Sequence, residues 1–425
     1  MKILLVNFAD TGGGAALASL RLVESLNAHG VYARLGVPKK KSASPYVFEL
    51  PKKRGFILVR LVRKALMLFD LNRAIFERFI PRPLKFCTTN GMRHTMNFWS
   101  ETDIGWINSS DFDVVNLHWI SGVISNRDIA KIKKPIVWTM HDSWPCCGAE
   151  HHPNIMEGDG RWKEGYFRKN KPASTTGIDL CRTVWRQKKK WLSSRRIDFI
   201  APSTWQHDVL KSSALFGACK CTVVPNIIDR TVFYPKDKSV VRAMLGIPAD
   251  KVVLGFGAAG DIDHPSSMKG SRLLLDALKS LENPDDYFLV VFGPASDAFT
   301  SLVSMPFFAS GYVSNPQILS CLYCACDCFI NPSRIENLPT MCLESVFCGV
   351  PVAAFDVGGT KDIVSHKENG YLARPYDAAE LSRGVEWCVA HRQELSRACL
   401  EKARRDFDED VILQKYLRAC EATLS

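Results

Sequence analysis

The sequence predicts an α/β protein made of two Rossmann-like domains with a cleft between them. A chain of 425 residues is too long for one average domain and suits two. Short apolar runs alternate with helical stretches along the chain, and this pattern restarts after the proline-bearing segment "VVPNIIDRTVFYP". Because strands separated by helices form parallel sheets covered on both faces, each half should be a doubly wound domain.

The first half opens with the apolar run "KILLVNF", which leads through "ADTGGGAA" into a helix that Gly30 ends. In "TGGGA", Gly13 and Gly14 allow backbone N–H groups to approach a ligand at the start of this helix. A tight strand–helix turn without a ligand is the alternative. Further strands are predicted at 113–120, 135–141, 198–203 and 221–226.

In the second half, strands are predicted at 251–257, 287–293, 326–333 and 351–359. We therefore expect an N-terminal domain over 1–227 and a C-terminal domain over 228–400. The remaining segment, 401–425, should be helical and pack back on the N-terminal domain.

The stretch "SRIENLPTMCLES" (333–345) places two glutamates around a helix start. Proline is tolerated in a first helical turn, so Pro339 predicts Glu336 in the preceding loop and Glu344 about two turns into the helix. The N–H groups around Leu338 to Met341 then lie at a helix N-terminus, which is a ready site for phosphate.

Composition and the N-terminus favour a cytoplasmic globular protein. The chain is 46% hydrophobic and 23% charged, as globular proteins are. The first apolar run is too short for a signal peptide, and no run reaches the ~18 residues of a spanning helix. Fifteen cysteines are then expected to be free thiols.

The net charge of +11 is concentrated between Lys39 and Arg93, a segment that contains fourteen Lys and Arg residues and only three Asp and Glu residues. Within it, Arg60, Arg63 and Lys64 share one helical face, which is typical of a helix on an anionic membrane surface. A solvated basic face over a core helix is the alternative. No recognised nucleic-acid-binding motif accompanies the charge, so we expect no nucleic-acid partner.

Two groups of cysteines have the residue types of metal sites. In "CLYCACDC", Cys326 and Cys328 are expected in a strand of the sheet, as small apolar residues. The loop "PCCGAEHHP" offers four candidate ligands, with Cys181 as a further one, but its spacing is not that of a recognised zinc finger. These four are Cys146, Cys147, His151 and His152. We assign no metal from the sequence.

The order of the motifs resembles glycosyltransferase family 4, the retaining enzymes of the GT-B fold. The resemblance runs from residue 1 to about 400 through "TGGGA", "TMHD", "APS", "VVPNIIDRTVFYP", "KG", "ENLPTMCLE" and "GVPVAAFDVGG". The stretch "NLHWI … WTMHDSWP" looks like the subgroup that builds bacterial exopolysaccharide and lipopolysaccharide chains. The resemblance implies a nucleotide-sugar donor, a saccharide or lipid-linked saccharide acceptor, and no cofactor.

The resemblance also implies roles for single residues. Lys269 matches the phosphate-binding lysine, and Glu344 the acid that accepts hydrogen bonds from ribose. Asn337 and Leu338 lie at the helix start that faces the donor phosphates. The catalytic pair it implies is Glu336, near the transferred sugar, and His141, the histidine of "T-x-H" that faces the donor.

Some features depart from the family or favour other functions. Many members carry an arginine after the first strand of the second domain, where this chain has Ala258 and Ala259. The run "GFGAAG" fits a dinucleotide fingerprint, but a loop rather than a helix follows it. The "DID" at 261–263 resembles a metal-binding motif of a different fold.

Two residues and the function itself keep alternatives. His118 is as readily a core histidine as a site residue, and Asp142 could simply orient its neighbours. A nucleotide-sugar isomerase or epimerase and a non-catalytic membrane-associated partner remain as alternative functions.

Overall fold

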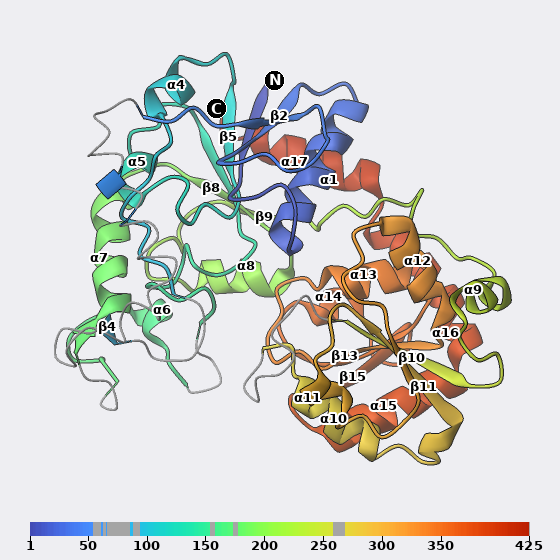
Figure 1. The fold of residues 1–425 in the computed structure, drawn as a ribbon. Helices are drawn as coiled ribbons and strands as arrows, with labels where there is room; N and C mark the ends of the chain where they lie inside the picture. Colours follow the sequence, from blue (N-terminus) through green and yellow to red (C-terminus); the bar gives the residue numbers. More distant parts are fainter. Residues whose placement is uncertain are drawn as a thin grey trace. The chain divides into compact units, whose positions relative to one another are not determined.

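The computed structural model divides the chain into two compact units, each with a parallel sheet (Figure 1). Domain 1 comprises Met1–Val224 together with Leu413–Ser425, and domain 2 comprises Pro225–Ile412. The structure describes residues 1–53, 61–62, 65, 86–87, 94–153, 158–172, 177–257 and 268–424. The prediction of two parallel-sheet α/β domains is confirmed.

In its described residues, domain 1 has a seven-stranded sheet in the order β3-β2-β1-β5-β6-β8-β9, with every pair parallel. The strands are β1 (Ile3–Val6), β2 (Ala33–Val37), β3 (Val47–Glu49), β5 (Val114–Leu117), β6 (Ile136–Thr139), β8 (Asp198–Ala201) and β9 (Cys221–Val223). A separate pair joins β4 (Phe86–Cys87) and β7 (Ile178–Asp179). The helices are α1 (Gly14–Ala28), α4 (Ile104–Ser109), α5 (Asn126–Ile129), α6 (Arg161–Glu164), α7 (Leu180–Leu192) and α8 (Thr204–Lys211).

Domain 2 has a parallel sheet in the order β12-β11-β10-β13-β14-β15 among its described residues. Its strands are β10 (Val252–Gly257), β11 (Tyr287–Phe292), β12 (Phe307–Ala309), β13 (Cys328–Asn331), β14 (Val352–Phe355) and β15 (Gly370–Ala373). Its helices are α9 (Lys238–Leu245), α10 (Ser271–Lys279), α11 (Asp297–Thr300), α12 (Pro316–Ala325), α13 (Thr340–Phe347), α14 (Thr360–Ile363), α15 (Ala378–Ala390) and α16 (Arg392–Asp406).

Each sheet reverses its strand order at one point, and there the loops at the carboxyl ends separate. In domain 1 this point lies between β1 and β5, and in domain 2 between β10 and β13. Open parallel sheets bind ligands in the crevice at such a switch point. The loops after these four strands are therefore where each domain is expected to bind.

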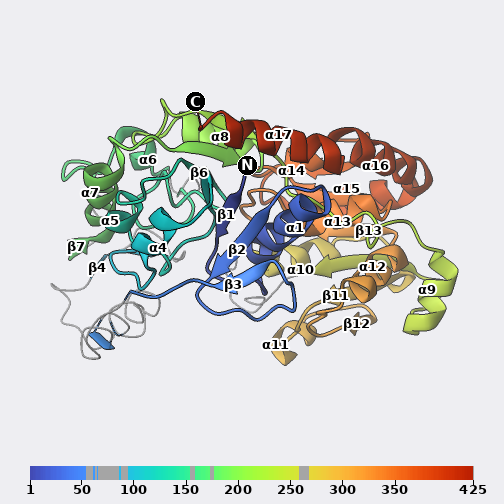
Figure 2. The ribbon, with the colours of Figure 1, turned by 90° about the horizontal axis from the view of Figure 1, so that it is seen from above.

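The C-terminal helix α17 (Glu409–Glu421) begins in domain 2 and ends in domain 1. Figure 2 shows α17 following α16 and leading to the C-terminus. The buried Tyr416 hydroxyl of α17 donates a hydrogen bond of 2.8 Å to Asn116 Oδ1 in β5. A hydroxyl and an amide that pair inside an apolar core remove each other's desolvation cost. The last residues of the chain thus form part of the domain 1 core.

Two sequence predictions need correction. The helix after Pro339 begins at Thr340, with Pro339 as its N-cap, rather than around Leu338. A proline N-cap takes an extended conformation, here φ −67° and ψ 105°, which leaves Leu338 in the loop. Cys326 is the C-cap of α12 rather than part of β13, although Cys328 does begin that strand.

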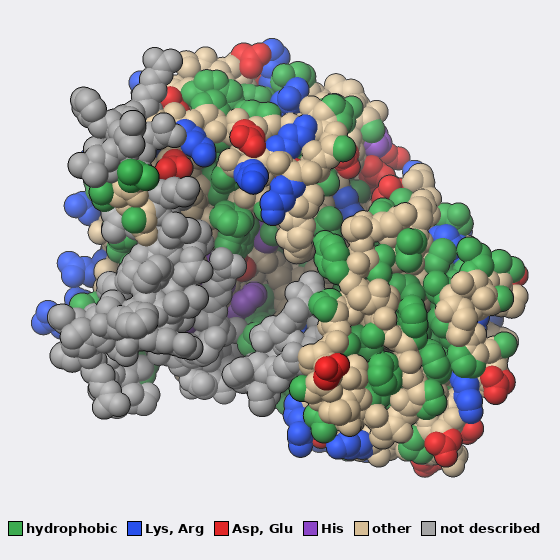
Figure 3. Space-filling model, viewed as in Figure 1, with side chains coloured by type: hydrophobic (Ala, Val, Ile, Leu, Met, Phe, Trp, Pro, Cys, Tyr) green, Lys and Arg blue, Asp and Glu red, His purple; other side chains and the backbone are tan. Residues whose placement is uncertain are grey.

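Several predictions fall outside the described residues. They concern the basic face of Arg60, Arg63 and Lys64, the position of the missing arginine at Ala258 and Ala259, and the run at 261–263. On the face drawn in Figure 3, acidic and basic side chains of the described residues are interspersed. Among the residues that the structure describes, no helix combines the length and the apolar character needed to cross a bilayer.

Candidate functional site

In domain 2, the loops that follow β10 and β13 are joined at the switch point. The Arg334 N–H donates to Met268 O at 2.8 Å, which ties the two loops together. Gly270 has a φ of 68°, and a Cβ on it would lie 1.9 Å from Pro332 O. Only glycine allows this approach, so the glycine of "KG" is a packing requirement.

Lys269 and Glu336, predicted from the sequence to share a site, form an ion pair here. Lys269 Nζ lies 2.6 Å from Glu336 Oε1, with 43% of the lysine side chain and 13% of the glutamate side chain exposed. Burial lowers the pKa of Lys269, but the Glu336 carboxylate outweighs it and the pKa is raised overall. The lysine therefore carries its positive charge at neutral pH, at the carboxyl edge of the sheet.

The backbone of Glu336 is held by the two glycines that follow β14. Gly359 N–H donates to Glu336 O at 3.1 Å. Gly358 has a φ of 56°, and a Cβ on it would lie 1.7 Å from that same oxygen. The "GG" of "AAFDVGG" thus fixes where the Glu336 carboxylate is placed.

Helix α13 begins directly after this loop. Its N-cap, Pro339, makes no side-chain capping bond, and Asn337 and Leu338 are buried immediately before it. The first N–H groups of a helix have no partner within the helix and lie at the positive end of its dipole. Together with Lys269, this helix start favours a phosphate-bearing ligand.

Glu344 lies in α13 and is 2% exposed. Its Oε2 accepts a hydrogen bond of 3.0 Å from the hydroxyl of Tyr323, which is buried in α12. Burial, and then the Glu344 charge, raise the pKa of Tyr323 well above its ordinary value, so the hydroxyl remains a donor. Sequence reasoning missed Tyr323, because only the packing of α12 on α13 brings it to Glu344.

Two more polar residues of this loop were not predicted. Asn331, at the end of β13, has a buried side-chain amide that is a hydrogen-bond partner of Cys342. Arg334 has its guanidinium 5.4 Å from the ring centre of Tyr376. An amide donor and a second cation therefore lie in the segment between β13 and Glu336.

In domain 1, the glycines after β1 form the turn into α1. Gly12 and Gly13 have φ of 75° and 95°, a Cβ on either would meet no atom within 4 Å, and Gly14 is the first residue of the helix. Gly12 and Gly13 thus have a conformation that favours glycine, whereas Gly14 does not have a positive φ. Asn7 connects this turn to the loop after β5, the strand beside β1 in the sheet. Its Nδ2 donates to Ala9 O, and its Oδ1 accepts from Trp119 N–H at 2.9 Å.

His118 and His141 follow neighbouring strands and bond to each other. His118 Nδ1 lies 2.8 Å from His141 Nε2. Burial lowers the pKa of His141 to about 4, against the opposing effect of Asp142, and it lowers the pKa of His118 well below its usual range. Both rings are neutral at pH 7, so each carries one N–H, and one ring donates to the other. The tautomer of His141 is therefore coupled to that of His118, which the sequence left undecided.

Asp142 organises a buried network beside this pair. Its Oδ2 accepts from Trp119 Nε1 at 2.7 Å and from His151 Nδ1 at 2.5 Å, and its Oδ1 accepts from Trp144 N–H at 3.0 Å. Burial raises the pKa of Asp142, but these donors, led by His151, lower it to about 2. The network fixes the loop that carries His141. His151, an earlier metal candidate, is engaged here, with Thr95 Oγ1 on its other nitrogen at 2.8 Å.

Comparisons with known proteins show what this chain is similar to. The family model of glycosyl transferases group 1 matches residues 264–406. A D-inositol 3-phosphate glycosyltransferase of Stackebrandtia nassauensis is 29% identical over 202 residues, or 44% of this chain and 45% of that protein. The putative teichuronic acid biosynthesis glycosyltransferase TuaC of Bacillus subtilis is 29% identical over 181 residues, covering 42% of this chain and 44% of that protein. The chain thus aligns with less than half the length of these relatives.

One solved structure with the same fold is Anabaena Alr3699/HepE in complex with UDP and glucose. It has a TM-score of 0.64 and 18% identity, with 99% of this chain and 100% of that chain covered. At this identity the likeness establishes the fold, which is GT-B.

Proposed function

We propose that this chain, a glycosyltransferase family 4-like protein, transfers a sugar with retention from a nucleotide-sugar donor to a saccharide acceptor. The observation that carries the proposal is the Lys269–Glu336 pair at the switch point of domain 2, next to the start of α13. Relatives that act on sugars and a neighbour solved with UDP and glucose support the class of donor.

The chemistry of such a transfer matches these residues. Expulsion of a nucleoside diphosphate builds negative charge on the leaving phosphates and positive charge on the anomeric carbon. Lys269 and the N–H groups of α13 stabilise the first, and the Glu336 carboxylate stabilises the second. A diphosphate at Lys269 competes with Glu336 for the same ammonium group, so donor binding frees the carboxylate for the sugar.

The remaining roles follow from position. Glu344, oriented by Tyr323, accepts hydrogen bonds from the ribose hydroxyls. Arg334 supplies the second cation for the phosphates, in place of the arginine absent at Ala258 and Ala259. In domain 1, His141 contacts the donor sugar with the ring nitrogen that His118 does not occupy.

The test is a screen of UDP-, GDP- and ADP-sugars against the full chain, with donor hydrolysis and nucleotide release as readouts. We expect turnover of at least one donor and release of a sugar with the anomeric configuration of the donor. Replacing Lys269 by Gln should lower turnover by about 10²–10³-fold, as loss of an electrostatic stabiliser does. Inversion of configuration, or unchanged turnover in the variant, would contradict the proposal.

For the acceptor, we propose a lipid-linked saccharide of cell-surface polysaccharide synthesis, reached from the inner face of the cytoplasmic membrane. The support is the sequence between Lys39 and Arg93, which carries the whole net charge of the chain. Each basic residue near an anionic surface contributes about 1 kcal/mol. Flotation with anionic and neutral liposomes should show salt-sensitive binding to the anionic ones only. Changing Arg60, Arg63 and Lys64 to Glu should weaken it, and equal binding to both liposome types would defeat the idea.

A further inference from the structure

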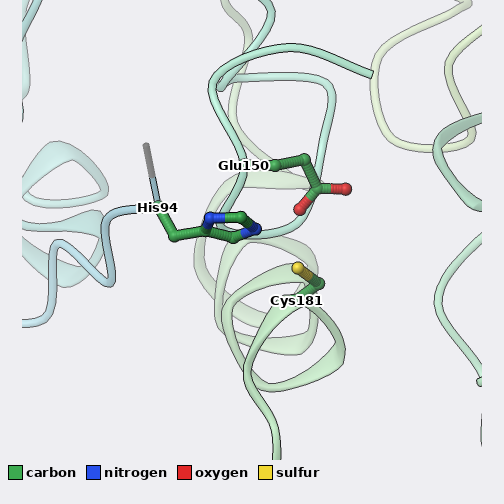
Figure 4. Close-up of side chains that lie close together, drawn as sticks. All are labelled: His94, Glu150 and Cys181. Atoms are coloured by element: carbon green, nitrogen blue, oxygen red, sulfur yellow. The ribbon is translucent and has the colours of Figure 1, made fainter. Parts of the chain in front are cut away.

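We propose that His94, Glu150 and Cys181 bind a zinc ion in the interior of domain 1. A ring nitrogen, a carboxylate oxygen and a thiol sulfur from these three buried residues all lie within 4.8 Å of one another. Figure 4 shows the three side chains pointing toward one point, from two loops and the first turn of α7. Zinc takes this mixture of nitrogen, sulfur and oxygen ligands, whereas magnesium and calcium prefer oxygen alone.

The main chain holds the three residues together. His94 and Glu150 face each other in an antiparallel bridge, and Thr95 N–H donates to Ala149 O at 2.8 Å. The loop packs onto the start of α7 at Gly148, where a Cβ would lie 2.5 Å from Cys181 O. Because these backbone contacts do not involve the ligand atoms, the site is preorganised for an ion.

The carboxylate of Glu150 has one supporting partner and one partner that is itself a candidate ligand. The buried Tyr166 hydroxyl donates to its Oε1. Its Oε2 is buried as well. The Cys181 thiol is a hydrogen-bond partner of the same carboxylate. A zinc ion would replace the thiol proton in this contact, because cysteine binds zinc as the thiolate. Tyr166 then has the supporting role that partners of metal-binding carboxylates have.

The spacing suits a tetrahedral ion after a small contraction. Zinc bonds of about 2.0–2.3 Å place neighbouring ligand atoms roughly 3.3–3.8 Å apart. Side-chain rotations that move the ligand atoms by about 1 Å therefore bring them to bonding distance of the ion. Three protein ligands leave the fourth position for a water molecule. The ion would join the segment at His94, the loop at Glu150 and helix α7, and since it binds the folded state it would stabilise domain 1.

The loop motif noted in the sequence does not itself form this site. His151 bonds to Asp142 and Thr95, and Cys146 is not among the converging residues. Cys146 is as fully buried as Cys181 and lies in the same loop as Glu150, so it provides a matched control.

The experiment measures metal bound to the full chain after purification without chelators and reconstitution with zinc chloride. We expect about one zinc ion per chain in the wild type and in Cys146→Ser, and background levels in Cys181→Ser and His94→Gln. Cobalt substitution should give a thiolate-to-metal charge-transfer band that Cys181→Ser abolishes. Chelation should lower the melting temperature of the wild type and leave that of Cys181→Ser unchanged.

Two results would overturn the proposal. One is a wild-type chain that is folded by circular dichroism yet takes up no stoichiometric zinc in a titration, a measurement that does not depend on whether the variants fold. The other is Cys181→Ser retaining as much zinc as the wild type, which would place the ion elsewhere.

Discussion

Replacing Gly358 by Ala should lower donor turnover while the protein still folds. Gly358 has a left-handed φ of 56°, and a Cβ there would lie 1.7 Å from the backbone oxygen of Glu336. Since Cβ atoms essentially never approach an oxygen closer than 3.0 Å, the Glu336 backbone must retreat by about 1.3 Å. That displacement separates the Glu336 carboxylate from Lys269, which it now contacts at 2.6 Å.

The expected magnitudes follow from these two effects. The left-handed conformation costs an alanine about 1–2 kcal/mol, which appears as a loss of stability. A misplacement of about 1 Å at a reacting group lowers turnover by about 10²-fold, or about 2.7 kcal/mol in the activation free energy. The activity loss should therefore exceed what the small loss of stability could cause in a folded protein.

Gly246 provides the matched control, because it has a φ of 67° at the end of α9 and a Cβ there would meet no atom within 4 Å. Urea unfolding should show the cost of the left-handed conformation alone in Gly246→Ala, and a larger loss in Gly358→Ala, where the Cβ also displaces the Glu336 backbone. Donor hydrolysis at saturating nucleotide sugar should fall only in Gly358→Ala. Equal turnover in the two variants would refute the reasoning that Gly358 positions Glu336.

Three further outcomes are expected. Glu344→Ala should weaken binding of the nucleoside diphosphate by about 1–3 kcal/mol, through lost ribose hydrogen bonds; unchanged affinity in calorimetry would remove Glu344 from the donor site. Glu336→Gln should keep much of that affinity yet lower turnover, because its interaction strengthens as charge develops, and near-normal turnover would contradict its role. The pKa of His141 is about 4 in the folded protein, against 6.5 for the ordinary side chain. Between pH 4 and 6.5 the unfolded chain therefore binds more protons at this residue than the folded protein does. The free energy of unfolding should thus fall as pH drops from 6.5 to 4, by at most about 1.4 kcal/mol per pH unit for this group, and His141→Phe should show a shallower fall in urea titrations.

The sequence determined the architecture and indicated several residues of the candidate site. Local signals were sufficient for the architecture, because short apolar runs typical of buried strands alternate with helical segments. This alternation predicts parallel sheets without knowledge of which side chains meet. Lys269, Glu336 and Glu344 could be named in advance from the resemblance to glycosyltransferase family 4, and Pro339 placed the two glutamates around a helix start. The edge strands β3, β12 and β15 were not predicted, since short strands at a sheet edge carry little apolar signal, and β2, which pairs with β3, was missed as well.

Only the tertiary structure decided which side chains meet. Tyr323 reaches Glu344, His118 reaches His141, and Tyr416 reaches Asn116 across 300 residues of chain. Each pair is created by packing between elements, and no local spacing encodes it. The same holds for His94, Glu150 and Cys181: the sequence drew attention to the neighbouring cysteines and histidines, but the approach of Gly148 to α7 selects the three residues that converge.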